Sequence, residues 1–132
     1  MMRRTGFLLL LAGLAACFED PVSGGSTING SYALQSINGA PLPNTPSASD
    51  TSRVIVVDDV ITLYGGFTYA QSGHRRANES APVLDFHGTG TYSIEGTSVR
   101  LRSNETGLQR IAQINANTMT LIEPQRTWVY RK

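Results

Sequence analysis

The fold is decided by residues 99–131, which read VRLRSNETGLQRIAQINANTMTLIEPQRTWVYR. Apolar and polar side chains alternate here in short runs, at residues 99–103, 108–114, 119–123 and 127–131. A period of two is typical of β-strands that are buried on one face. The segments between the runs, residues 104–107, 115–117 and 124–125, are rich in residues that favour turns. The stretch therefore predicts an antiparallel meander.

The same pattern continues upstream to residue 30. We expect further strands at residues 30–36, 54–57, 60–64, 83–87 and 91–94, and one that opens at 67–69. We expect turns at Asp58-Asp59, Gly65-Gly66, Gly88/Gly90 and Glu95-Gly96, and polar loops at residues 38–52 and 74–82. No stretch after Cys17 has a helical apolar period, so the predicted fold class is all-β.

A closed barrel is the architecture that we predict for residues 30–132. About eight short strands in one small domain leave two sheet edges exposed unless the sheet closes on itself. We therefore expect a small antiparallel up-and-down β-barrel, with an open β-sandwich as the alternative. One domain of this size has enough chain for a single modest core.

The N-terminus has the pattern of an export signal. Arg3 and Arg4 precede an apolar run of 11 residues, 6–16, that leads into the chain's one cysteine. The run is shorter than the roughly 20 residues that a transmembrane helix needs. It is typical of a cleaved signal peptide, which we expect at residues 1–16. Residues 17–29, which contain Pro21 and Gly24-Gly25, are expected to form a flexible tether.

The tetrad Leu14-Ala15-Ala16-Cys17 resembles the lipobox of bacterial lipoproteins. The resemblance implies that a diacylglyceryl group is joined to the Cys17 thiol and that cleavage follows between Ala16 and Cys17. The new amino group often receives a fatty acyl chain, such as palmitate, as well. The exported chain would then be anchored to a membrane by covalent lipid. Phe18, where an aspartate resembles an inner-membrane retention signal, favours the outer membrane, with the domain facing the periplasm or the surface.

Charge and cysteine content narrow the choice of partners. The chain from Cys17 onwards has 9 basic and 10 acidic residues, and the basic ones are scattered along it. Nucleic-acid binding needs a clustered basic surface, so we exclude a nucleic-acid partner. Because the one cysteine is used by the anchor, we expect no disulfide in the domain.

Several segments resemble small lipocalin-like bacterial lipoproteins. They are Gly30-Ser31-Tyr32, INGAPLP at residues 37–43, Gly90-Thr91-Tyr92, TMTL at 118–121 and VYR at 129–131. The resemblance covers roughly residues 30–132 and implies the same barrel. In that family an aromatic residue of the first strand packs at the closed end beneath an arginine near the last strand. Tyr32 with Arg126 or Arg131 would be the matching pair.

The sequence contains no recognisable catalytic or metal-binding set. Asp85 and His87 share one strand face and His74 could add an imidazole, but a zinc site needs three or four ligands. The adjacent carboxylates of Asp58 and Asp59 would point to opposite faces of a strand, so a turn explains them better than acid–base chemistry. Nucleophile-elbow, phosphate-loop and HExxH motifs are absent from the sequence. We expect no enzyme, no metal and no cofactor.

The aromatic residues are the candidates for a ligand pocket or a core, and alternation can turn them inward: Tyr32, Phe67, Tyr69, Tyr92, Trp128 and Tyr130. An eight-stranded barrel is just wide enough to be filled by side chains or to hold one small ligand. We expect a membrane-anchored lipoprotein that binds a small apolar ligand, with residues 38–52 as a lid over the barrel mouth. The alternative is a non-enzymatic structural lipoprotein with a filled core, which contacts another protein of the cell envelope.

Overall fold

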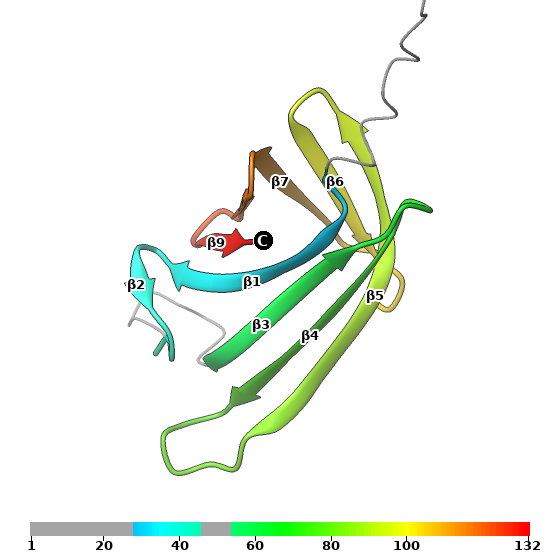
Figure 1. The fold of residues 1–132 in the computed structure, drawn as a ribbon. Helices are drawn as coiled ribbons and strands as arrows, with labels where there is room; N and C mark the ends of the chain where they lie inside the picture. Colours follow the sequence, from blue (N-terminus) through cyan, green and yellow to red (C-terminus); the bar gives the residue numbers. More distant parts are fainter. Residues whose placement is uncertain (1–27, 46–53) are drawn as a thin grey trace, which may run out of the picture.

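The computed structural model describes residues 28–45 and 54–132, and these form an all-β domain (Figure 1). Its strands are β1 (Gly30–Ile37), β2 (Ala40–Pro41), β3 (Ile55–Leu63), β4 (Thr68–Arg76), β5 (Leu84–Glu95), β6 (Ser98–Ser103), β7 (Gln109–Asn115), β8 (Thr118–Ile122) and β9 (Thr127–Arg131). The described residues include no helix that is long and apolar enough to cross a membrane. The expected signal peptide, the expected lipidation site Cys17, most of the expected tether and residues 46–53 of the expected loop lie outside the described residues.

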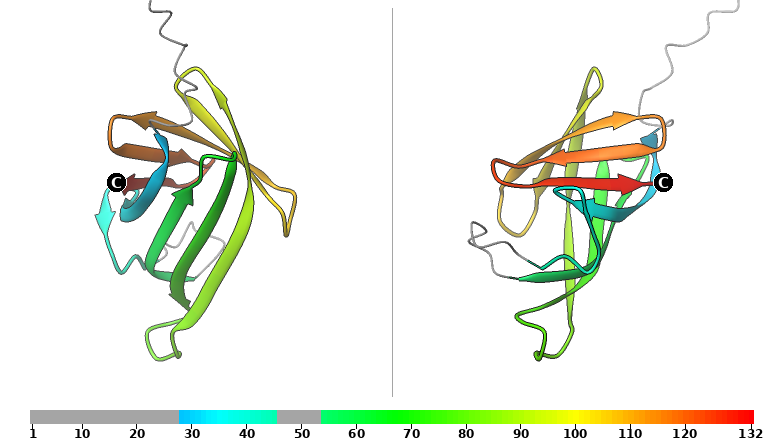
Figure 2. Two further views of the ribbon diagram at one scale, coloured as in Figure 1. Left: turned by 45° about the vertical axis from the view of Figure 1, so that its right-hand side comes forward. Right: turned by 90° about the vertical axis from the view of Figure 1, so that its left-hand side faces the viewer.

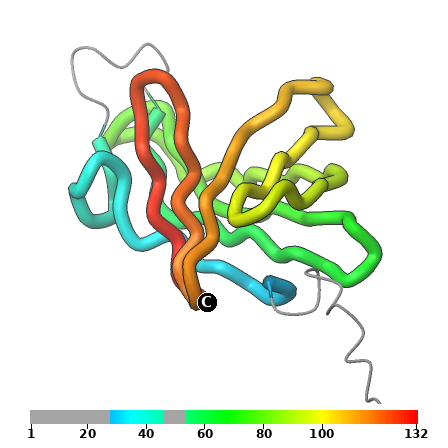
Figure 3. Tube along the Cα trace, turned by 90° about the horizontal axis from the view of Figure 1, so that it is seen from above, coloured from blue at the N-terminus to red at the C-terminus, as the bar shows by residue number. Residues whose placement is uncertain are grey.

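The sheet closes into an eight-stranded antiparallel barrel, with the two-residue β2 as an extra strand beside β1. From β3 onwards each strand pairs with the next one along the chain, β1 pairs with β3, and β9 returns to pair with β1. Figure 3 shows this closure, with the C-terminal strand in red beside β1. In the right-hand view of Figure 2, β8 and β9 run across the direction of β3–β5. The predicted barrel is therefore confirmed over the open sandwich.

The turns alternate between the two ends of the barrel because successive strands run in opposite directions. We call the end with the turns at residues 64–67, 96–97 and 116–117 the closed end. The open end carries residues 38–45, 77–83, 104–108 and 123–126. Gly96, Ala116 and Gly107 have positive φ, as tight turns require. The predicted turns at Gly65-Gly66, Glu95-Gly96, 104–107, 115–117 and 124–125 are all confirmed.

The predicted turn at Asp58-Asp59 is wrong, because β3 runs through both residues as one strand of nine. A register shift between Val56 and Asp58 shows a β-bulge, which bends the strand without ending it. Asp58 is exposed and Asp59 is buried, so the two side chains do point to opposite faces. Asp59 can be inside because two other strands bring hydrogen-bond donors to it.

The predicted turn at Gly88/Gly90 is also wrong, because β5 continues through it for 12 residues. Its first part, from Leu84 to Thr91, pairs with β4, whereas its last part, from Gly90 to Glu95, pairs with β6. At Gly90 a Cβ atom would overlap the Arg102 carbonyl oxygen and the Tyr69 ring. This glycine therefore allows two strands and a buried ring to meet at the point where β5 changes partner.

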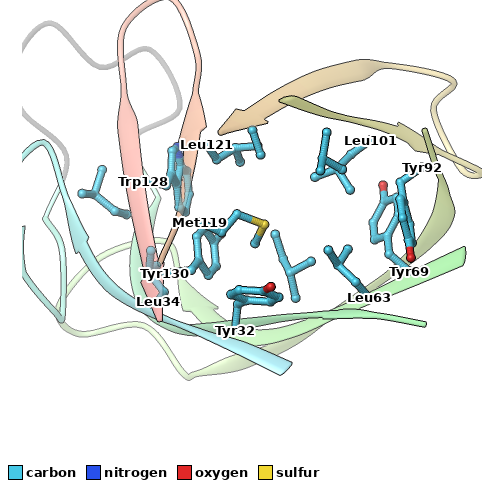
Figure 4. Packing of buried hydrophobic residues seen from close by; sticks show 14 of the residues in the cluster. Tyr32, Leu34, Leu63, Tyr69, Tyr92, Leu101, Met119, Leu121, Trp128 and Tyr130 are labelled. Carbon is cyan, nitrogen blue, oxygen red and sulfur yellow. The ribbon is translucent and has the colours of Figure 1, made fainter. Parts of the chain in front are cut away.

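The core takes buried side chains from all eight strands of the barrel (Figure 4). Most of its larger buried side chains come from alternate positions of their strands, and they include Tyr32, Leu34, Ile61, Leu63, Tyr69, Tyr92, Leu101, Met119, Leu121, Trp128 and Tyr130. Two tyrosines keep their hydroxyls satisfied at the closed end. Tyr32 donates to the Ile28 carbonyl at 2.6 Å, and Tyr92 donates to the Tyr64 carbonyl at 2.6 Å. Period-two burial thus produces the packed interior that the sequence pattern predicts.

Candidate functional site

A cavity of about 700 Å³ lies between the inner faces of β4 and β5 and the open end of the barrel. We call it the mouth cavity. Its wall consists of side chains from β4, β5, β7 and β9 together with residues 103–109 and 123–126. The cavity borders the first half of β5. This half is not paired with β6, because the pairing of β5 with β6 begins only at Gly90.

Aromatic rings form the apolar part of the wall. They belong to Tyr69 on β4, Phe86 on β5 and Trp128 on β9. The indole Nε1 of Trp128 donates to a Glu123 carboxylate oxygen at 3.1 Å, which holds the ring in place. Such rings supply a large apolar contact area with few rotatable bonds. The mouth cavity therefore has a rigid surface on which an apolar or aromatic body could pack.

Three arginines line the same cavity: Arg75 on β4, Arg110 on β7 and Arg126 in the turn before β9. The Arg75 guanidinium lies 3.9 Å from the centroid of the Phe86 ring. The guanidinium of Arg126 lies 5.0 Å from the centroid of Trp128, and its Nε is 3.9 Å from a Glu123 oxygen. Cations above aromatic faces are attracted by the ring electrons, so the rings also hold the arginines.

A buried chain of hydrogen bonds supports the wall from behind. The Tyr130 hydroxyl and the Gln71 amide both donate to one oxygen of Asp59, each at 2.6 Å. Arg110 then donates to the Gln71 side-chain oxygen at 2.8 Å. Gln71 thus receives one bond and donates another, so its orientation is determined on both sides. The chain links the core at Tyr130 to the cavity wall at Arg110.

Burial dominates the electrostatics of this chain. It raises the pKa of Asp59, while hydrogen bonds from Tyr130 and Gln71 and the charges of Arg75 and Arg110 act in the opposite direction. Burial, followed by the charge of Asp59, raises the pKa of Tyr130 well above its ordinary value. Burial also lowers the pKa of the Arg75 guanidinium, an effect that Asp59 counters. The other oxygen of Asp59 and the Arg75 Nε are buried without a hydrogen-bond partner among the described residues.

The six predicted aromatics divide into different places. Tyr32, Tyr92 and Tyr130 are buried in the core, whereas Tyr69 and Trp128 are buried and also line the mouth cavity. The expectation that Phe67 points inward is wrong. It is 47 % exposed in the turn before β4, and its ring lies 5.6 Å from the Tyr92 ring. Positive φ at Phe67 shows that it belongs to the turn, where the alternation of the strand does not apply.

The expected pairing of Tyr32 with Arg126 or Arg131 is also wrong. The cation above the Tyr32 ring is Lys132, whose Nζ lies 5.7 Å from the ring centroid. Arg126 belongs to a turn at the open end, and Arg131 is an exposed residue of β9. The C-terminal residue therefore takes the place that the family resemblance gave to an arginine.

The two histidines do not combine into a metal centre. On the outer face, His74 Nδ1 lies 2.7 Å from an Asp58 oxygen and its Nε2 lies 3.3 Å from Asp85. The hydrogen bond that His74 donates to the Asp58 carboxylate raises the pKa of His74. His87 lines the mouth cavity instead. Within the two described ranges, no group of three or more His, Cys, Asp or Glu side chains is arranged to hold a metal ion.

Sequence reasoning missed the polar residues Gln71, Arg75 and Arg110 of the cavity wall, and the buried Asp59 behind it. A period of two that starts at Tyr69 places Gln71, Gly73 and Arg75 on the same inward face. The expectation of a loop from residue 74 hid this pattern.

Comparison of the chain with protein-family models, with curated proteins and with solved structures finds no significant match.

Proposed function

We propose that the chain is a bacterial lipoprotein whose barrel binds a small ligand with an apolar body in the mouth cavity. Lipid on Cys17 would hold the domain at the membrane, with the outer membrane favoured by Phe18. The observation that supports binding is the cavity of about 700 Å³ with its aromatic wall. Its volume falls in the range of about 300–1,000 Å³ that is usual for small-molecule sites.

The packed core supports binding in the mouth cavity rather than in the middle of the barrel. Tyr32, Leu101 and Met119 fill the interior of the barrel and are fully buried. The mouth cavity is therefore a local recess on a filled scaffold, which is how a rigid binding site is usually built. The lid role expected for residues 38–52 stays a proposal. Of this loop, residues 38–45 are described, and Asn44 pairs with Val56 beside the start of β3.

A pair of glycine variants tests the proposal. Gly88 lines the cavity, and the nearest atom to a Cβ built on it is a Glu105 oxygen at 3.9 Å. Gly88→Phe should therefore fill the cavity with little strain. Gly66 lies in the turn at the closed end, and a Cβ built on it has nothing within 4 Å, so Gly66→Phe is the matched control.

The readout is native mass spectrometry of the protein purified from its own membrane. We expect a small-molecule adduct on the wild type and on Gly66→Phe, and its loss from Gly88→Phe. A wild type with no adduct, or an adduct that Gly88→Phe retains, would contradict binding in the mouth cavity. The structural or interaction lipoprotein with a filled core would then be the better hypothesis.

A further inference from the structure

The mouth cavity contains more positive charge than a site for a purely apolar ligand needs. Arg75, Arg110 and Arg126 all line it. A guanidinium that is taken partly out of water requires a partner, because desolvation disfavours the charged form. The carboxylates near the three arginines therefore decide whether the cavity itself is already neutralised.

Two glutamates line the cavity, and both are engaged at its rim. Glu105 accepts hydrogen bonds from the Thr89 backbone at 3.1 Å and from the Ser103 hydroxyl at 3.0 Å. Backbone hydrogen bonds accordingly lower its pKa. Glu123 accepts from the Trp128 indole at 3.1 Å and lies beside Arg126. Glu105 therefore stabilises the loop before β7, and Glu123 is the ion-pair partner of Arg126.

Arg75 and Arg110 differ from Arg126 in this respect. Arg110 donates its hydrogen bond to a neutral amide, that of Gln71, and Arg75 lies above the neutral Phe86 ring. Asp59 attracts both arginines through space but accepts its hydrogen bonds from Tyr130 and Gln71. The buried Nε of Arg75 has no hydrogen-bond acceptor in the part of the chain that the structure describes.

These contacts also orient the two cations. The hydrogen bond to Gln71 orients the Arg110 guanidinium, and the Phe86 ring lies against the Arg75 guanidinium. Arg75 is also 5.9 Å from the centroid of Trp128, so the charge and the aromatic wall belong to one surface. Guanidinium groups on such supports are suited to bind a planar carboxylate through charge-assisted hydrogen bonds.

We propose that the ligand of the mouth cavity is a small organic anion, with its carboxylate on Arg110 and Arg75 and its apolar body against Phe86 and Trp128. This inference rests on the proposed function and specifies the chemical class of the ligand. It differs from the expectation of a purely apolar ligand, because the charge of the ligand contributes to its recognition.

A matched pair of ligands tests the inference. 1-Naphthylacetate carries a carboxylate, and 1-naphthylacetamide has nearly the same shape without the charge. Each is titrated by isothermal calorimetry into the protein purified from its membrane in detergent micelles, with empty micelles as the blank. We expect the acid to bind about tenfold more tightly than the amide, as hydrogen bonds to charged groups allow.

Arginine variants then locate the effect. Arg110→Gln and Arg75→Gln should each weaken binding of the acid about tenfold and leave binding of the amide within about twofold. Arg102→Gln is the control, because Arg102 is exposed on β6 and lies outside the lining of the cavity. It should change neither affinity.

The outcomes separate this inference from the proposed function. Equal binding of acid and amide would overturn the anion while leaving the binding module intact. Failure of both ligands to bind would overturn the inference and contradict the binding module. The comparison of acid with amide on the wild type needs no variant, so it decides the question even if an arginine variant does not fold.

Discussion

At the scale of single residues, Asp59 shows how a charged side chain can be part of the interior. Its exposed fraction is 1 %, and a buried carboxylate without partners is strongly unfavourable. Tyr130 and Gln71 supply donors from β9 and β4, which lie on either side of β1 and β3 in the closed barrel. The position of Asp59 therefore depends on closure as well as on its own strand.

Removing one donor from Asp59 tests this dependence. Tyr130→Phe keeps the buried ring but deletes the hydroxyl, so Asp59 retains the donor of Gln71 alone at that oxygen. We expect the free energy of unfolding to fall by about 1–3 kcal/mol. Urea denaturation followed by the fluorescence of Trp128, the chain's one tryptophan, measures it. The control is Tyr64→Phe, which alters a ring that is 50 % exposed and should lower the free energy of unfolding by less than about 0.5 kcal/mol. Equal losses of unfolding free energy in the two variants would contradict the role of Tyr130.

The raised pKa of Asp59 also predicts a pH dependence of stability. Because burial raises this pKa in the folded state, the folded chain binds the proton more tightly than the unfolded chain does. The contribution of Asp59 is fully present below its unfolded pKa of roughly 4 and is lost as the pH rises through the higher folded pKa. We expect the unfolding free energy of the wild type to fall relative to that of Asp59→Asn across this window. Parallel pH profiles from urea denaturation would show that Asp59 is not perturbed.

At the scale of elements, β5 determines where the cavity lies. It changes partner from β4 to β6 around Gly90 and Thr91, so its first half borders the mouth cavity. Gly90 permits this change because Tyr69 and the Arg102 carbonyl occupy the space that a Cβ would take. Two glycines in one strand thus have different roles, because Gly88 borders open space and Gly90 a close backbone contact.

Two alanine substitutions distinguish these roles. Gly90→Ala should push β5 away from β6 and destabilise the barrel by about 1–3 kcal/mol, the usual cost of overpacking. Gly88→Ala, two residues earlier, meets nothing closer than 3.9 Å and should change stability by less than about 0.5 kcal/mol. Urea denaturation of both variants measures the difference. A tolerated Gly90→Ala would mean that the strands can separate there without loss.

At the scale of the whole molecule, the proposed arrangement is a closed barrel held near a membrane by its N-terminus. The C-terminal strand completes the barrel by pairing with β1, so the described domain has its two terminal segments in one place. Lys132 also donates its backbone N–H to the Asn117 carbonyl at 2.8 Å. Both ends of the described domain are thus part of the closure, and the proposed anchor at Cys17 lies in the segment that precedes β1.

The lipid anchor is tested on the intact chain. Cells that express it are fed an alkyne fatty acid, and the purified protein is then coupled to an azide dye. We expect the wild type to be labelled and Cys17→Ala to lose the label. We also expect the wild type in the membrane fraction. Ser23→Ala, in the same expected tether, is the control and should label like the wild type. Equal labelling of Cys17→Ala and wild type would overturn lipidation at this residue.

The sequence by itself determined the elements whose signals are local. Alternation and turn residues predicted the strands in the last third of the chain, and β9 in particular has the predicted bounds, Thr127–Arg131. They also predicted a closed barrel, since this many strands without covered edges must close. The strand and turn predictions depend on neighbours within a few positions, which is the range over which local propensity acts, whereas the barrel was inferred from the number of strands in the domain.

Tertiary structure alone decided which polar residues meet inside the barrel. Asp59 and Tyr130 are 71 positions apart, and Gln71 and Arg110 are 39 apart. No local pattern reveals that such a donor will stand opposite such an acceptor, so the pair Asp58-Asp59 resembled a turn. The cavity has the same origin, because its arginines converge from β4, β7 and the turn before β9 only when β1 and β9 close the sheet. A buried charge is stable where its partner is supplied, and long-range strand pairing supplies it.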